Sequence, residues 1–174
     1  MSRSVAGKAQ DGAIIRRLVA LARRNFPRGH PVPFAAQINS ADPERPVAIA
    51  LNRVVLGCDP TAHAEVRAIR LACRRRGQAN LAGCTLYTTC EPCPMCLTAA
   101  LIAGIERVVY GTVVRRPDAT SPPLFDYRAK AFAARSGFSC RVDGPVEEPL
   151  CRALVDDPQV RRYIARQGRK GVFI

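Results

Sequence analysis

The chain has 174 residues, 48% of them hydrophobic, and a formal net charge of +13. This length suits a single domain, residues 1–174, with a buried core, and no run of about 18 apolar residues is present that would predict a membrane-spanning helix. The first residues lead into no apolar segment, so we expect no secretory signal and a cytoplasmic protein.

Apolar periodicity and turn residues divide the first third of the chain. Isoleucine, leucine and valine at helical spacing predict a helix over Asp11–Asn25, which ends at the turn Phe26–Gly29. Two strands follow, Pro33–Ile38 and Pro46–Leu51, with a polar loop between them.

The middle of the chain alternates helix and strand. A helix is expected from Ala62 to about Arg76, with Thr61 as its N-cap. A buried strand, Cys84–Thr89, comes next. A second helix is expected to begin near Pro92, because the missing N–H of proline costs little in a first turn.

The last third continues the alternation. It contains a strand at Arg107–Gly111, a helix from about Asp126 to Arg135, a short strand at Phe138–Val142, and a helical segment over Val146–Gln167 that is interrupted at Asp157-Pro158. This order predicts one α/β domain with three layers, α/β/α, in which helices cover both faces of a mixed five-stranded sheet.

Two short motifs carry the chemistry, His63-Ala64-Glu65 and Pro92-Cys93-Pro94-Met95-Cys96. They supply one imidazole, two thiolates and one carboxylate that is not needed as a ligand. Zinc prefers nitrogen and sulfur donors, and a catalytic zinc site keeps three protein ligands and one open position. The order H-x-E then P-C-x-x-C is the known pattern of zinc-dependent nucleobase deaminases. We therefore predict one Zn²⁺ per chain, bound by His63, Cys93 and Cys96.

Both motifs are expected at the N-terminus of a helix, and this position suggests how they would act. Two helix N-termini would point at one spot, where their positive dipole ends stabilise thiolate and hydroxide. Zinc lowers the pKa of a bound water to about 7. Glu65 would take the proton of that water, pass it to a ring nitrogen of the base and protonate the departing amine, which leaves as ammonia.

The cysteines permit a second interpretation of the metal site. Cys84 and Cys90, together with Cys93 and Cys96, would form a structural four-cysteine zinc site. That arrangement leaves His63 and Glu65 without a role. Thiols stay reduced in the cytoplasm, so we expect metal binding rather than disulfides to explain Cys93 and Cys96.

From Asn52 to Tyr110 the chain resembles the cytidine deaminase superfamily, most closely the bacterial guanine deaminases and next the tRNA adenosine deaminases. The stretches that carry the resemblance are residues 59–70, with the sequence DPTAHAEVRAIR, and residues 86–97, with the sequence LYTTCEPCPMCL. Cys90 and the Pro94-Met95 pair favour the guanine enzymes.

The resemblance implies a cytidine-deaminase-like fold in which the matching residues bind zinc, move protons and form the pocket. It assigns Asn52 and Ala64 to the purine site. It also implies an acidic residue beyond the fourth strand that helps to hold guanine, for which Asp126 is the best match and Asp118 the second. By analogy with the guanine enzymes we expect a homodimer.

The formal net charge of +13 is compatible with an RNA partner but does not require one. Runs such as Arg74–Arg76 and Arg161–Arg162 would attract phosphates. No aromatic residues interleave these runs, so the stacking platform typical of single-strand binding is absent from the sequence. All but three of the basic residues are arginine in an alanine-rich chain, a composition that codon usage alone produces.

Our hypothesis from the sequence is zinc-dependent hydrolytic deamination of a purine base, guanine first, to give xanthine and ammonia. The alternative is deamination of adenosine to inosine in tRNA, for which the basic surface would be the footprint. A hypothesis from another class is a non-catalytic zinc or nucleic-acid-binding module, which would bind zinc without turnover.

Overall fold

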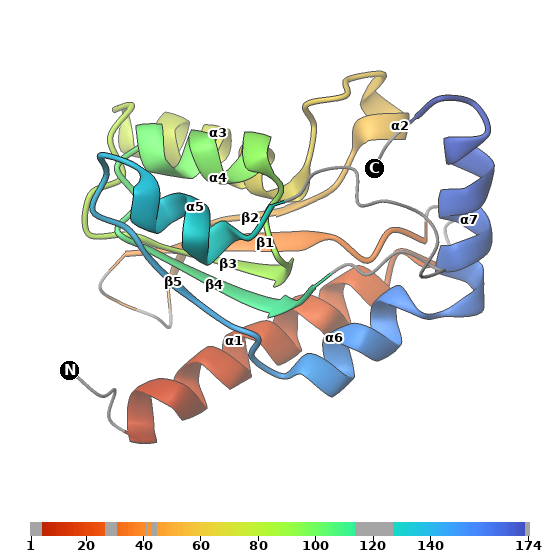
Figure 1. The fold of residues 1–174 in the computed structure, drawn as a ribbon, viewed down its shortest axis with the longest axis horizontal. Coiled ribbons are helices and arrows are strands. Elements are labelled where there is room, and N and C mark those ends of the chain that lie inside the picture. Colours follow the sequence, from red (N-terminus) through yellow and green to blue (C-terminus); the bar gives the residue numbers. More distant parts are fainter. Residues whose placement is uncertain (1–4, 27–30, 41, 43–44, 114–126, 173–174) are drawn as a thin grey trace.

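A five-stranded mixed sheet forms the middle layer of the computed structural model, which describes residues 5–26, 31–40, 42, 45–113 and 127–172 (Figure 1). The strand order is β2-β1-β3-β4-β5. β1 is antiparallel to both β2 and β3, whereas β3, β4 and β5 are parallel to one another. The strands are β1 (Ala35–Asn39), β2 (Pro46–Leu51), β3 (Thr85–Cys90), β4 (Arg107–Thr112) and β5 (Arg141–Asp143).

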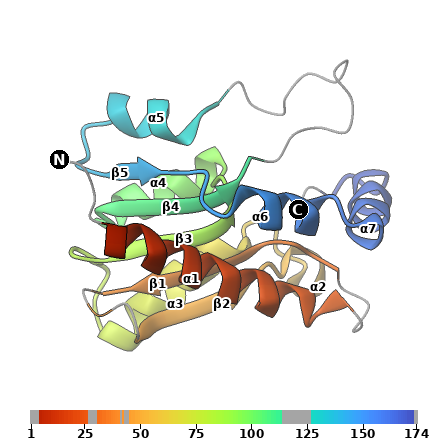
Figure 2. The same cartoon turned by 90° about the horizontal axis from the view of Figure 1, so that it is seen from below.

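Helices cover both faces of this sheet (Figures 1 and 2). One face carries α1 (Val5–Arg23) and α6 (Glu148–Val155), and the other carries α3 (Ala64–Arg76), α4 (Pro94–Ile102) and α5 (Ala129–Arg135). The short α2 (Val54–Gly57) follows β2, and α7 (Pro158–Gly168) lies at the end of the molecule toward which β3 and β4 run. The predicted α/β/α architecture with a mixed five-stranded sheet is confirmed.

Successive side chains of a strand point to opposite faces of the sheet, so the protein has two hydrophobic cores, one on each face. On β3, Leu86 packs into the core beneath α3, α4 and α5, whereas Tyr87 packs into the core beneath α1 and α6. The second core is filled largely by α1, whose largest fully buried side chains are Ile14, Ile15 and Leu18. These residues are the apolar stripe that the sequence predicts for this helix.

Polar contacts fasten α1 to parts of the chain far away in sequence. The Asp11 carboxylate, 1% exposed, accepts from Arg107 Nη2 at 2.7 Å and from the Tyr87 hydroxyl at 3.1 Å. Arg107 also donates through Nε to Asp143 at 2.7 Å. Farther along the helix, Arg16 pairs with Glu147. The partners of α1 therefore lie between 76 and 131 positions later in the chain.

Some predicted boundaries are wrong by a few residues. α1 begins at Val5 rather than Asp11, because the intervening residues are mostly good helix formers that carry no apolar periodicity. β5 spans Arg141–Asp143 rather than Phe138–Val142. Phe138 lies in a turn, where its backbone N–H donates to Ser136 Oγ and its side chain is 50% exposed.

The C-terminal helical segment divides as the sequence predicts. α6 ends at Val155, and Asp157 caps α7 by accepting from the backbone N–H of Gln159 at 2.8 Å. Pro158 then opens α7. Among the described residues, no helix combines the length and the apolar character needed to cross a membrane.

Gly111 allows β4 and α6 to approach closely, and this contact yields a stability prediction. A Cβ at this position would lie 2.2 Å from Cys151 Sγ and 2.6 Å from the backbone oxygen of Thr89. We expect Gly111→Ala to lower the melting temperature by roughly 3–10 °C, because a strand backbone atom cannot move aside cheaply. Gly137→Ala is the control, since nothing lies within 4 Å of its Cβ position. Equal melting temperatures for both variants, measured by calorimetry, would contradict the close packing of α6 on β4.

Candidate active site

The two helices α3 and α4 begin at predicted metal ligands. His63 is the N-cap of α3 and Cys93 is the N-cap of α4, both with extended backbone. Neither side chain caps its own helix, so both are free to face a ligand. The predicted starts are wrong by two residues, because Thr61 does not cap α3 and Pro92 precedes α4, whose first residue is Pro94.

A hydrogen-bonded loop sets the position of His63. Asp59 Oδ1 accepts from the backbone N–H of Thr61 at 2.8 Å and from its hydroxyl at 2.7 Å. These two hydrogen bonds hold the pKa of Asp59 below its usual value. The backbone N–H of Arg53 donates to the oxygen of Ala62, which ties this loop to the end of β2. Thr61 therefore shapes the loop before the helix instead of capping it.

The predicted ligands converge at one point. His63 Nδ1 lies 3.5 Å from Cys96 Sγ and 3.8 Å from Cys93 Sγ, and the three donor atoms all lie within 4.8 Å of one another. A tetrahedral zinc with ordinary Zn–S and Zn–N bond lengths would separate its sulfur and nitrogen ligands by roughly 3.6 Å. Both the donor types and their spacing fit one zinc ion per chain.

The two thiols of this group interact strongly with each other. The hydrogen bond between Cys96 and Cys93 lowers the pKa of Cys93 and raises that of Cys96. The two thiols therefore share a proton, and a cation that binds both sulfur atoms replaces it, which is the usual coupling between metal binding and thiol ionisation.

Glu65 lies beside the ligands without being one of them. Its side chain is 5% exposed, and its Oε2 is 3.6 Å from Cys96 Sγ. The Thr88 hydroxyl donates to Glu65 Oε1 at 3.1 Å and so fixes the carboxylate. Burial raises the pKa of Glu65 above its usual value, so the carboxylate binds a proton more readily than an exposed one.

Asn52 is one of the two predicted purine-site residues that the structure describes. It is 4% exposed, and its Oδ1 accepts from the backbone N–H of Val54 at 3.1 Å. Its Nδ2 is buried and has no hydrogen-bond partner within the described residues. Ala64 is the first residue of α3 and is fully buried. Asp126 and Asp118 lie outside the described residues.

The four-cysteine interpretation of the metal site is wrong. Cys84 precedes β3 and contacts Arg76 Nη1 at 3.0 Å, whereas Cys93 follows the opposite end of that strand. Cys90 is buried but does not belong to the ligand group. All eight cysteines are free thiols in this structure.

Three residues near the site were missed from the sequence. Thr88 shares a strand face with Leu86, and this alternation together with the strand's position before Pro92 is the signal that would have placed it near Glu65. Glu91, which follows β3, accepts a hydrogen bond from the first residue of α5, and Tyr127 precedes that helix; no sequence pattern indicates this contact.

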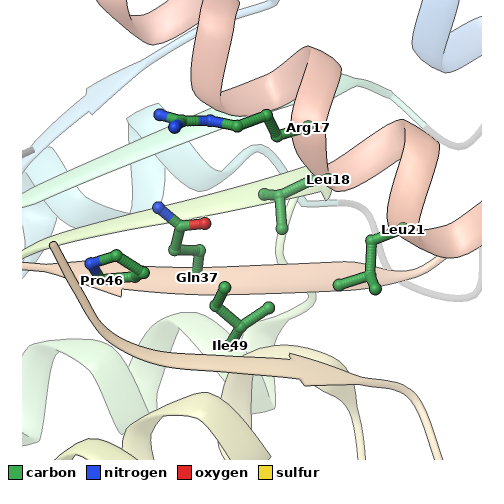
Figure 3. Close-up of a pocket in the computed structure, with 6 residues that line it drawn as sticks. All are labelled: Arg17, Leu18, Leu21, Gln37, Pro46 and Ile49. Carbon is green, nitrogen blue, oxygen red and sulfur yellow. The ribbon is translucent and has the colours of Figure 1, made fainter. Parts of the chain in front are cut away.

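A separate hollow of about 200 Å³ lies on the opposite face of the sheet (Figure 3). It is lined by residues of α1, β1 and β2, namely Arg17, Leu18, Leu21, Gln37, Pro46 and Ile49. None of them belongs to the ligand group or contacts Glu65. The hollow is therefore distinct from the site between α3 and α4.

Fold and site together define a zinc-binding α/β/α protein with a buried carboxylate next to its metal ligands. The zinc-binding region of cytidine and deoxycytidylate deaminases matches residues 8–112, which is more than half of the chain. The chain belongs to this family.

Relatives within the family act on different substrates. Guanine deaminase of Bacillus subtilis is 45% identical over 96 residues, which cover 55% of this chain and 60% of that protein. The tRNA-specific adenosine deaminase of Aquifex aeolicus is 39% identical over 116 residues, covering 63% of this chain and 75% of that protein. A crystal structure of a variant of the protein NE0047 in complex with 8-azaguanine has a TM-score of 0.70 at 26% identity, covering 88% of this chain and 84% of that one.

Proposed function

We propose that this chain is a zinc-dependent hydrolase that deaminates a purine base, guanine first, to give xanthine and ammonia. The observation that carries the proposal is the buried Glu65 carboxylate, held by Thr88 and 3.6 Å from a thiol of the His63, Cys93 and Cys96 group. A structural zinc site has no use for such a carboxylate. The family and the guanine deaminase relative support the same class of reaction.

The chemistry assigns a separate task to each residue. His63, Cys93 and Cys96 hold the metal, which lowers the pKa of a bound water to about 7. Glu65 accepts a proton from the attacking water as its oxygen bonds to the ring carbon. It delivers that proton to the adjacent ring nitrogen, then takes the remaining proton from the new hydroxyl group and gives it to the amino group. The C–N bond breaks and ammonia leaves, so that one water is consumed for each base.

Asn52 supports a substrate with a polar heterocyclic edge. Its Nδ2 is a buried donor without a partner in the described part of the chain, and such a group costs stability unless a ligand satisfies it. A ring nitrogen or exocyclic oxygen of a purine is an acceptor of the required kind. The 8-azaguanine bound by NE0047 is a base of this class. Purine contacts by Ala64 and Asp126, a homodimer and a cytoplasmic location stay predictions from the sequence.

A tRNA substrate is the second candidate, and the arginines of α7 favour it. Arg161, Arg162 and Arg166 are exposed, as is the C-cap Arg169, and α7 lies at the end of the molecule toward which β3 and β4 run (Figure 1). The run Arg74–Arg76 supports it less. Arg75 donates to a backbone oxygen and Arg76 to Cys84, and both lie at the far end of α3, about 20 Å from its N-terminus.

An ammonia-release screen at several salt concentrations separates these candidates. We expect release from guanine that changes little with salt, because a neutral base offers no phosphates that compete with salt ions. A tRNA substrate would instead lose affinity steeply with salt, since each neutralised phosphate releases counterions. Inosine formation in tRNA, without ammonia from guanine or related bases, would overturn the first proposal. Bound zinc without any turnover would favour a non-catalytic module.

A further inference from the structure

Tyr127 carries a buried hydroxyl that has no hydrogen-bond partner in the described part of the chain. The ring itself is well held. It packs against the core beneath α3, α4 and α5, and its centroid lies 5.5 Å from that of Phe132. A buried polar atom without a partner destabilises the fold. An orphaned hydroxyl on a fixed ring therefore needs an explanation, and a ligand is one.

Glu91 brings Tyr127 to the metal ligands. Its Oε1 accepts from the backbone N–H of Ala129 at 2.9 Å, which is the first residue of α5, and its Oε2 lies 3.6 Å from Arg128 Nη1. The Glu91 side chain is only 9% exposed. Glu91 is two residues before Cys93 and Tyr127 is two residues before Ala129, so one hydrogen bond joins the ligand loop to the segment that carries the phenol.

The charges around Tyr127 are those of the site. Burial raises its pKa, and the negative charges of Cys93, Glu91 and Cys96 raise it further. The phenol therefore keeps its proton at neutral pH and is available as a donor. Asn52 Nδ2 is also a buried donor without a partner among the described residues.

We propose that Tyr127 contacts the substrate by donating a hydrogen bond from its hydroxyl to an acceptor atom of the heterocycle held at the His63, Cys93 and Cys96 site. This inference rests on the proposed function, because it requires a heterocyclic base at that site. It adds a specificity-determining residue from the segment between β4 and α5. The proton donor favours a base that presents an oxygen or an unprotonated ring nitrogen at that edge.

The test is Tyr127→Phe, which removes one oxygen and keeps the ring. In the zinc-loaded protein without substrate, we expect the melting temperature to rise by about 2–4 °C, because an unsatisfied buried hydroxyl is gone. We also expect the KM for guanine and the Kd for 8-azaguanine, measured by titration calorimetry, to rise roughly three- to tenfold. Stability and binding thus change in opposite directions, which a structural role does not produce.

Tyr87→Phe is the matched control. Its phenol lies in the core on the other face of the sheet and donates to Asp11 at 3.1 Å, so it has a partner. We expect the same chemical change there to lower the melting temperature by about 2–4 °C and to leave KM and the affinity for 8-azaguanine unchanged. The zinc content of both variants should equal that of the wild type.

The role of Glu91 offers a second, independent variant. Glu91→Ala removes the acceptor for Ala129, so Tyr127 is no longer held beside the site, and KM should rise as in Tyr127→Phe. The double variant should show little further loss, because both changes remove the same contact. Arg128→Ala is the control for this pair, since Arg128 is 69% exposed and its ion pair contributes little.

The outcomes distinguish this inference from the function on which it rests. If the wild type releases ammonia from guanine while Tyr127→Phe leaves KM and the affinity for 8-azaguanine unchanged, the inference is wrong and the proposed function stands. If the wild type neither turns over a purine base nor binds 8-azaguanine, both are wrong. A lower melting temperature for Tyr127→Phe with unchanged binding would make Tyr127 a purely structural residue.

Discussion

Glu65→Gln should abolish most of the ammonia release while the protein keeps its zinc and its fold. We expect a loss of at least about a hundredfold in kcat, the lower end of what a positioned acid and base contributes. The amide has the same shape and can still accept the hydrogen bond from Thr88, now 3.1 Å from the carboxylate. It cannot take a proton from water, so the reaction loses its proton carrier and nothing else.

The control for this change is Glu106→Gln. Glu106 is an exposed carboxylate that accepts from the backbone N–H of Gly83 at 3.1 Å, a bond that glutamine can also accept. We expect wild-type kcat for this control. Zinc content and melting temperature should match the wild type in both variants. Near wild-type ammonia release by zinc-loaded Glu65→Gln would remove Glu65 from the mechanism.

Loss of any one ligand should remove the metal altogether. We expect His63→Ala, Cys93→Ala and Cys96→Ala each to purify with far less than one zinc per chain, because two remaining protein ligands do not form a stable site. Activity should fall to background in all three. Metal analysis of the purified variants by mass spectrometry measures this directly.

Cys90→Ala is the matched control for the ligand variants. Cys90 is buried near the same loop but lies outside the ligand group. Its replacement should leave the zinc content at about one per chain. Full zinc in Cys93→Ala, combined with loss in Cys90→Ala, would contradict the ligand assignment.

The convergence of the three candidate metal ligands could be predicted from sequence because their geometry is local. His63 and Cys93 each precede a helix, and Cys96 lies three residues after Cys93 in the first turn of the second one. Only one long-range contact, that of α3 with α4, is then needed to bring His63 to the two cysteines. The alternation of helix and strand along the sequence already implies this contact. The same locality explains why the order of layers could be predicted.

Residues that reach the site by long-range contacts could not be predicted. Tyr127 is held by a hydrogen bond between Glu91 and Ala129, 38 positions apart, and no periodicity marks that pair. The first residues of α3 and α4 were predicted wrongly for a related reason. At Thr61 the side chain prefers Asp59 over the helix N-terminus, a competition between two hydrogen bonds that residue type alone does not decide.

The long-range ion pairs of α1 affect when this helix can pack during synthesis of the chain. Asp11 cannot form its ion pair until Arg107 has been synthesised, and Arg16 cannot pair until Glu147 has been added 131 residues later. At about 5–20 residues per second, that interval lasts roughly 6 to 26 s. Until it ends, the apolar side of α1, with Ile14, Ile15 and Leu18, lacks its full complement of partners on the nascent chain. Chaperones that capture exposed apolar helices therefore have this whole interval in which to bind α1.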